Sequence, residues 1–286
     1  MWMANGGENR TAQCLGRLFP RAQREFQRYV LVNWRRALKA ARERPKYHVG
    51  NFHLQVFVIS LDRTRQRKLE TIRSLDMQRI AWATHLAVDG LDDLDPVSVT
   101  MYAGHKKQKR LGLTTGMGLA QLVSIKQDYD NSKYLPAHLR VSLHERLRFG
   151  CYMSHVSLWQ NLVQMEVPYA VVLEDDAVVT DRFSDELKAK LQRLPDNWDI
   201  LFLNGCYKKL GYVFDDGLRQ SRGGLCTFAY TISLKGARYL LQRAVRSDKP
   251  IDHVIDYETL LGHLISFHAD PPLAHTSSNK LSTLAY

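Results

Sequence analysis

Three acidic residues, Glu174, Asp175 and Asp176, stand side by side directly after the apolar run 168–173. Adjacent carboxylates repel one another, so a divalent cation or hydrogen-bond donors must offset their charge, and oxygen ligands suit Mn²⁺ or Mg²⁺. Such a cation can bridge two phosphates and neutralise a diphosphate leaving group. The triplet therefore predicts metal-assisted transfer from a nucleotide-sugar. Acidic residues are also common at helix caps and in solvent-facing loops, and that reading stays open.

The three acids receive different roles from their order. In an extended segment alternate side chains point the same way, so Glu174 and Asp176 share one face. We expect Asp176 to bind the metal, and Glu174 to face the nucleotide ribose or to bind the metal through a water molecule. Asp175 is expected to lie close to the nucleotide.

Strands and helices alternate around the triplet. Short apolar, β-branched runs predict strands at 54–59, 169–173, 199–203 and 226–233. Helices are expected at 64–75, 152–165, 183–194 and 236–244. This order predicts an α/β fold with a sheet between helices, in which ligands bind at the carboxyl ends of the strands.

Two segments stand apart from this core. Residues 17–46 carry ten basic residues, with apolar residues at helical spacing, and predict a basic amphipathic helix. That helix either contacts an anionic membrane surface or packs on the domain as an ordinary surface helix. Residues 92–148 contain the basic tract 105–110 and several glycines, and predict an insertion, partly helical, whose charges are most simply a solvated surface. We therefore divide the chain into an N-terminal basic extension at 1–50 and one domain at 51–286.

Composition bounds the class of protein. The chain has 286 residues, 45% of them hydrophobic, and a formal charge of +11, which favours an anionic partner such as a nucleotide, a nucleic acid, a lipopolysaccharide or a phospholipid surface. Its four cysteines are far apart and fit neither a zinc motif nor a dense disulfide scaffold, so a reducing cytoplasm is expected. We find no signal peptide or membrane span in the sequence, so contact with the inner face of the cytoplasmic membrane would be peripheral.

Four motifs, in order, resemble those of glycosyltransferase family 25, the lipooligosaccharide β-galactosyltransferase group with collagen galactosyltransferase relatives. They are VISLDR at 58–63, AVDG at 87–90, GCYMSH at 150–155 followed by Leu158 and Trp159, and VLEDD at 172–176. Weaker matches follow at 229–230, 236–237 and 250–252. The long basic segment between Gly90 and Gly150 and the first fifty residues depart from the family pattern.

The resemblance implies a single GT-A-like (Rossmann-like) domain with a mixed sheet, a UDP-sugar donor, a divalent metal and an inverting transfer to a sugar hydroxyl. The first two motifs would border the nucleotide through Ser60, Asp62, Arg63 and Asp89. Ser154 and His155 would lie close to the donor, although a lone histidine is more simply a satisfied core residue. The implied acceptor is a lipooligosaccharide, a lipopolysaccharide or another glycan or glycolipid.

An inverting transfer needs a base that takes the proton of the attacking hydroxyl. Asp252, which matches a family position, is the first choice, with Asp256 and Glu258 in reserve. Asp252 is nearly as well explained as the N-cap of a helix at 254–264. A further metal ligand is expected near the C-terminus, His275 ahead of His253 and His268, although a solvent-exposed histidine is the simpler explanation there.

Two other functions compete with this one. A nucleotidyl or phosphoryl transferase also needs clustered carboxylates, but the chain has no GxxxxGK[ST] phosphate loop. A nucleic-acid-binding module would use the basic charge, but we find no zinc-finger spacing, no RRM signature and no aromatic residues interleaved with the basic tracts. We therefore expect no nucleic acid partner.

Overall fold

The computed structural model describes residues 54–62, 67–90, 137–206, 209–244 and 249–277, and the side chains of 137–146 and 244 are not described. The predicted basic helix at 17–46, the basic tract at 105–110 and Arg63 lie outside these residues. So does most of the predicted insertion. Its last part, however, belongs to a helix that begins at Ala137 and runs unbroken into the GCYMSH motif.

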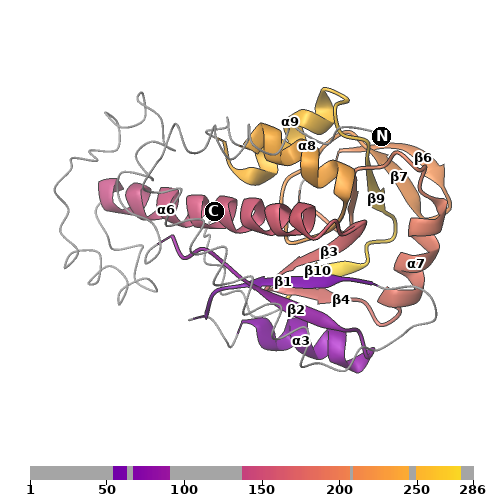
Figure 1. Cartoon of the computed structure of the whole chain (residues 1–286), viewed down its shortest axis with the longest axis horizontal. Helices are drawn as coiled ribbons and strands as arrows, with labels where there is room; N and C mark the ends of the chain where they lie inside the picture. Colours follow the sequence, from indigo (N-terminus) through magenta and orange to yellow (C-terminus); the bar gives the residue numbers. More distant parts are fainter. Residues whose placement is uncertain (1–53, 63–66, 91–136, 207–208, 245–248, 278–286) are drawn as a thin grey trace, which may run out of the picture.

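An eight-stranded mixed sheet forms the centre of the described chain (Figure 1), in the order β2-β1-β3-β8-β5-β9-β7-β6. Its strands are β1 Val56–Ser60, β2 Trp82–Leu86, β3 Tyr169–Glu174, β5 Ile200–Phe202, β6 Leu210–Asp215, β7 Leu218–Ser221, β8 Ala229–Ser233 and β9 Ser266–Ala269. β1 pairs in parallel with β2 and β3, whereas β8 is antiparallel to both β3 and β5. The sheet is therefore mixed, as the family resemblance implies.

Five helices of the described chain cover the two faces of the sheet: α3 Lys68–Met77, α6 Ala137–Gln164, α7 Phe183–Arg193, α8 Leu234–Ala244 and α9 Ile251–Leu260. β3 shows how one strand serves both faces, because Val172 packs in a core with α6, α8 and α9, while Val171 and Leu173 pack with α3 and α7. Successive strand residues point to opposite faces, so an apolar run such as 170–173 can be buried throughout. The result is a three-layer α/β/α arrangement (Figure 1).

The strands predicted at 54–59, 169–173, 199–203 and 226–233 are confirmed as β1, β3, β5 and β8, with ends that shift by a few residues. The predicted helices are confirmed as α3, α6, α7 and α8, and the helix expected at 254–264 as α9. Six strands were not predicted: β2, β4, β6, β7, β9 and β10. Most of these are short or carry polar residues, so their pattern in the sequence is weak.

A second, two-stranded sheet joins β4 Ala177–Val179 to β10 Ala274–Thr276. β4 follows the acidic triplet directly, and the Ser277 N–H donates to the Asp176 carbonyl oxygen (2.7 Å). The Ser277 hydroxyl also contacts the Glu70 carboxylate on α3. The last described residues therefore lie beside the triplet.

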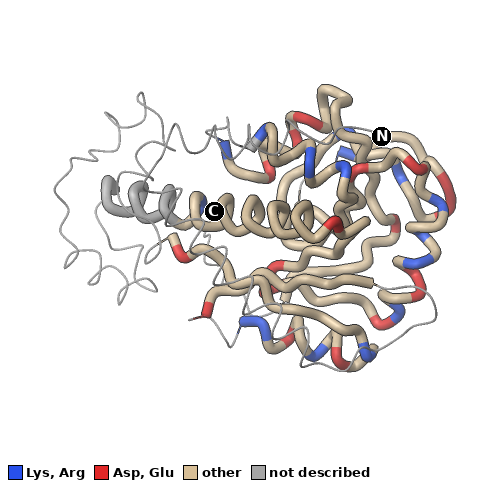
Figure 2. Tube along the Cα trace, in the orientation of Figure 1, with Lys and Arg blue, Asp and Glu red and all other residues tan. Residues whose placement is uncertain are grey.

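The hairpin of β6 and β7 forms one edge of the large sheet. β6 exposes apolar side chains of Leu210, Tyr212, Val213 and Phe214. Basic and acidic residues both occur along this hairpin and along α7 (Figure 2), for example in the ion pair between Arg193 and Asp216. These elements do not form a basic face of the kind that nucleic acid requires.

Candidate active site

The carboxyl ends of β1 and β3 lie side by side because the two strands pair in parallel, with Ile59 opposite Glu174. Ser60, at the end of β1, is buried, and its hydroxyl lies 3.4 Å from Asp175 Oδ2. A cleft opens at this edge, where open α/β sheets bind their ligands. It is lined by Ile59, Ser60, Leu61, Arg67, Ala87, Val88, Gly90, Leu147, Cys151, Ser154, His155, Glu174 and Asp175.

Arg67, just before α3, binds two members of the acidic triplet. One guanidinium nitrogen lies 3.1 Å from Asp175 Oδ1 and 2.9 Å from Asp176 Oδ2. The side chains are largely buried, so the cation offsets much of the repulsion between the acids. Arg67 was not predicted: the triplet signals that a positive charge is needed, but no spacing in the sequence says which of 40 basic residues supplies it.

Asp176 keeps an unused ligand atom. Its Oδ1 is buried and has no hydrogen-bond partner among the described residues. Burial, together with the nearby charge of Glu174, raises the pKa of Asp176 from its usual 3.8 to about 6, even with Arg67 beside it. An unsatisfied buried carboxylate oxygen fits a divalent cation, which would supply the missing contact and favour the ionised form.

A chain of buried hydrogen bonds, which begins at Trp159 on α6, holds the Glu174 carboxylate. Trp159 Nε1 donates to the Tyr230 hydroxyl (2.9 Å), which lies 2.9 Å from His155 Nδ1, and His155 Nε2 lies 3.3 Å from Glu174 Oε1. We assign the Tyr230 proton to the Nδ1 bond, which leaves Nε2–H to donate to Glu174. His155 is thus buried, and it both orients Glu174 and lines the cleft.

The network also sets the charge of Glu174. Burial by itself would raise the pKa of Glu174, but the hydrogen bonds from His155 and Thr227 and the charge of Arg67 outweigh it and lower the pKa. Glu174 is therefore ionised at neutral pH. Burial raises the pKa of Tyr230 well above its usual value, so its hydroxyl remains a neutral link in the chain.

The AVDG and GCYMSH motifs meet at a close contact between backbones. A Cβ on Gly150 would lie 2.7 Å from both the Gly90 nitrogen and the Val88 oxygen, so only glycine fits at this crossing. Four residues on, the Ser154 hydroxyl donates to the Gly150 carbonyl (2.7 Å) and accepts from the Val88 N–H (2.8 Å). Ser154 lines the cleft, and its hydroxyl is engaged in fixing the 87–90 loop; its predicted closeness to the donor stays a prediction.

The other residues predicted beside the nucleotide lie near the same edge of the sheet. Asp89, buried, follows β2 in the loop that Ser154 fixes, whereas Asp62 is exposed in the turn after β1. Neither contributes to the lining of the cleft as described. Their predicted contacts with the nucleotide stay predictions.

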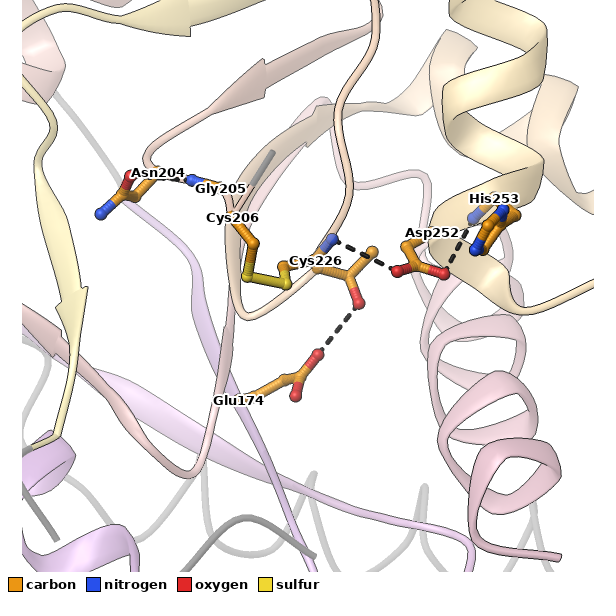
Figure 3. The surroundings of a disulfide bond; sticks show 8 residues. Glu174, Asn204, Gly205, Cys206, Cys226, Asp252 and His253 are labelled. Carbon is orange, nitrogen blue, oxygen red and sulfur yellow. Dashed lines mark hydrogen bonds between the residues drawn. A yellow bond between two sulfur atoms is a disulfide. The ribbon is translucent and has the colours of Figure 1, made fainter. Parts of the chain in front are cut away.

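A disulfide joins Cys206 to Cys226 (Figure 3). Cys226 and the next residue make hydrogen bonds to two candidate acids, Asp252 and Glu174. The Thr227 hydroxyl donates to Glu174 Oε1 (3.0 Å), and the Cys226 N–H donates to Asp252 Oδ2 (3.3 Å). Cys226 itself has φ +70, a left-handed conformation that side chains other than glycine rarely adopt. The cysteine spacing in the sequence gave no sign of this bond, because the two residues lie on separate strand connections that only the sheet brings together.

The three candidate bases lie along α9 but in different surroundings. Asp252 is in the first turn of α9, whose N-cap is Pro250, so the alternative explanation of Asp252 as the N-cap is wrong. Its Oδ1 accepts from the His253 N–H (2.9 Å). Both oxygens of Asp256 accept from Lys209 Nζ (2.9 Å each). Glu258 contacts Tyr239 (2.5 Å) and His263 (2.8 Å) instead of the triplet.

The predicted histidine ligand does not join the acids as described. His275 is exposed on β10, opposite Val178. Among the described residues, Cys151, His155 and Glu174 form a group that could hold a metal ion, because their ligand atoms all lie within 4.8 Å of one another. Cys151 and Thr227 were not predicted, since neither residue type stands out until the fold brings it to Glu174.

Comparison with known proteins supports the interpretation of the motifs. Residues 53–255 match the model of glycosyltransferase family 25, described as an LPS biosynthesis protein family. Among the described helices, none combines the length and the apolar composition needed to cross a membrane.

Three similar proteins come from animals. A Mus musculus protein named "Inactive glycosyltransferase 25 family member 3" is 24% identical over 225 residues, 75% of this chain and 32% of that protein. Homo sapiens "Procollagen galactosyltransferase 2" is 25% identical over 216 residues, 69% of this chain and 29% of that protein. An Aedes aegypti "Glycosyltransferase 25 family member" is 23% identical over 248 residues, 82% of this chain and 34% of that protein. The chain thus spans about a third of the length of these relatives.

Proposed function

Because the chain belongs to glycosyltransferase family 25, we propose that it transfers a hexose, galactose first among the candidates, from a UDP-sugar to a hydroxyl group of a glycan acceptor. One relative is named as a procollagen galactosyltransferase, but another is named as inactive, so membership alone does not establish activity. The observation that carries the proposal is the cleft beside Glu174-Asp175-Asp176, with Asp176 Oδ1 buried and unpaired.

The acids and Arg67 form the donor side of the proposed site. Asp176 would bind Mn²⁺ or Mg²⁺ through its unpaired oxygen, and that ion would neutralise charge on the departing diphosphate. Arg67 holds Asp175 and Asp176 in place, and its guanidinium also lines the cleft, where it can contact phosphate. Glu174, ionised and fixed by His155 and Thr227, is placed to accept a hydrogen bond from a ribose hydroxyl.

Asp252 remains the proposed base for an inverting transfer. It lies across the Cys226–Thr227 segment from Glu174 (Figure 3), and the charges of both acids act on Cys151 in the cleft. Asp256 and Glu258 are bound to Lys209 and to Tyr239 with His263, which makes them weaker candidates. A base in this position takes the acceptor proton as the sugar bond forms.

The family description, the relatives and the disulfide bear on the acceptor and on the location of the protein. The family description points to a lipopolysaccharide glycan and the relatives to collagen, so a glycolipid and a protein-linked hydroxyl are both candidates. Peripheral contact with a membrane through the basic segment 17–46 fits the first of these. The Cys206–Cys226 disulfide weighs against the reducing cytoplasm expected from cysteine spacing, since such bonds persist in oxidising compartments.

Donor binding tests the class of enzyme. We expect UDP and UDP-galactose to raise the melting temperature only when Mn²⁺ or Mg²⁺ is present, because the ion joins the diphosphate to Asp176. ATP and GTP serve as controls for the nucleotidyl transferase alternative. Equal stabilisation by nucleoside triphosphates, or UDP binding in excess chelator, would argue against the proposed donor site.

Acid replacement tests the proposed base. Asp252→Asn is expected to slow hexose transfer by at least about 100-fold, since general base catalysis is typically worth 10²–10⁴-fold. Stabilisation by UDP with Mn²⁺ should persist, because the donor side is intact. Asp216→Asn, at a side chain 95% exposed, is the matched control. Transfer at the control's rate by Asp252→Asn would remove Asp252 from the mechanism.

A further inference from the structure

The floor of the cleft holds a second set of metal-ligating groups, different in chemistry from the oxygen atoms of Asp175 and Asp176. Cys151 and His155 are four residues apart on α6, so their side chains lie on one face of the helix. Glu174 approaches from the end of β3, and the three ligand atoms lie within 4.8 Å of one another. His155 Nε2 and Glu174 Oε1 are already 3.3 Å apart, close to the separation of two ligands around a tetrahedral ion.

We propose that Cys151, His155 and Glu174 form a binding site for Zn²⁺ or a similar thiolate-binding cation. Sulfur and imidazole ligands select zinc over Mn²⁺ or Mg²⁺, which prefer oxygen. Three protein ligands with a fourth position open to a cleft is the pattern of an accessible zinc site. This site shares Glu174 with the proposed donor site but differs from the oxygen-ligated ion proposed at Asp176 in its sulfur and nitrogen ligands, and cation binding to it does not depend on transferase activity.

Two of the three ligands, His155 and Glu174, already have outer contacts of the kind that orient zinc ligands. His155 Nδ1 is bonded to Tyr230, whose hydroxyl is fixed in turn by Trp159, and Glu174 is bonded to Thr227. Such partners orient metal ligands and tune their affinity. The side chain of His155 is fully buried, so the ring has little freedom to turn away from the site.

Binding requires a balanced movement of protons. The Cys151 thiol releases its proton to solvent as the sulfur–zinc bond forms. The His155 proton moves from Nε2 to Nδ1, and the Tyr230 hydroxyl keeps its own proton but rotates, so that its oxygen accepts from Nδ1–H instead of donating to Nδ1. Nε2 then binds the ion. Glu174 enters as the carboxylate. One proton is released for each Zn²⁺ bound, as expected for a thiol ligand.

Cobalt provides the probe, because a cysteine thiolate bound to Co²⁺ gives a sulfur-to-metal absorption band. The full chain is prepared with Cys14→Ser, so that Cys14 cannot contribute, and without a thiol reductant, so that Cys206 and Cys226 remain paired. We expect one Co²⁺ to bind per chain, with the band, and Zn²⁺ to displace it. No band in this protein would overturn the proposal.

Three variants separate this site from its neighbours. Cys151→Ser should abolish the band, with Cys151→Ala as the second variant if serine does not fold. Asp176→Asn should keep the band while it loses Mn²⁺-dependent UDP binding. Tyr230→Phe, which removes the outer contact of His155 together with the acceptor of Trp159 Nε1, should weaken Co²⁺ binding by about 10–100-fold. A band that survives both Cys151 variants, or that Asp176→Asn removes, would show that the site is elsewhere.

Discussion

Glu174 and Asp176 are two residues apart, yet their surroundings move their pKa values in opposite directions. Hydrogen bonds from His155 and Thr227 outweigh burial and lower the pKa of Glu174, whereas burial and the charge of Glu174 raise that of Asp176 to about 6. Carboxylates separated in this way usually have different roles. Glu174 is therefore charged at neutral pH, whereas the charge of Asp176 costs free energy unless a cation offsets it.

Replacing Asp176 by asparagine should therefore stabilise the metal-free protein at neutral pH. A folded-state pKa of about 6, above the usual 3.8, means that ionisation weakens the fold. The cost is absent below about pH 4, grows between pH 4 and 6, and reaches at most about 3 kcal/mol above that. Denaturant unfolding in chelator at pH 4 and pH 7 measures it. We expect the free energy of unfolding of Asp176→Asn to exceed that of the wild type only at pH 7. A variant less stable than the wild type at pH 7 would contradict the raised pKa of Asp176.

At this scale the sequence predicted the acids better than their partners. Glu174, Asp175 and Asp176 are recognisable because three adjacent carboxylates after a buried strand need compensation. Arg67 and Thr227 come from turns whose position depends on how the strands pair, and no local pattern reports that pairing. Side-chain roles such as that of Ser154, which fixes a loop, are equally invisible before the backbones meet.

At the scale of helices and strands, the contact between α6 and the 88–90 loop determines where the cleft lies. Gly150 allows the two backbones to touch, and Ser154 then joins them by hydrogen bonds. The same helix carries Cys151 and His155 into the cleft, one residue and five residues after the contact. A shift of α6 by one residue relative to the 88–90 loop would therefore displace the side chains of both Cys151 and His155.

Gly150→Ala should destabilise the protein although alanine is the better helix former. The new Cβ would meet two backbone atoms at 2.7 Å, and overpacking of this kind costs about 1–3 kcal/mol, against about 1 kcal/mol gained in helix propensity. Gln160→Ala, on the same helix, is the control and should change little. The melting temperatures of both variants decide the matter, and a gain in stability for Gly150→Ala would mean that the contact is looser than described.

Elements were predictable where burial made them apolar. β1 and β3 are easy to recognise in the sequence because both faces of each strand are covered and their residues are apolar. α7 is recognisable because acidic residues stand in its first turn and basic residues in its last. β7 (LRQS) and β9 (SFHA) are not, because their polar residues interrupt any apolar run. The extent of α6 was also underestimated, since the polar residues from Ala137 onward carry no boundary signal.

In the whole molecule, the site depends on segments far apart in the chain. β3 pairs with β1 on one side and with β8 on the other. The cleft is lined by residues from Ile59 to Asp175, and Thr227, just before β8, bonds to Glu174. The Cys206–Cys226 disulfide closes the loop that contains the β6–β7 hairpin, and it holds the segment between Glu174 and Asp252. The bond therefore links the stability of the sheet edge to the geometry of the acids.

Reduction should lower stability measurably. The disulfide joins residues 20 positions apart, for which loss of the cross-link is expected to cost about 3 kcal/mol. We expect a lower melting temperature after treatment with a thiol or phosphine reductant. The double variant Cys206→Ser, Cys226→Ser should already have the lower value and should not respond further. A wild type that does not respond to reductant would show that the bond contributes little.

Tyr230 limits how this sequence can diverge. Its hydroxyl serves Trp159 and His155 at once, inside a core with no access to water, so phenylalanine at 230 would strand two buried polar groups together. A single substitution at position 230 is therefore destabilising. We expect residues 155, 159 and 230 to change together in evolution. Functional relatives that lack one of these three side chains are expected to have replaced the others as well.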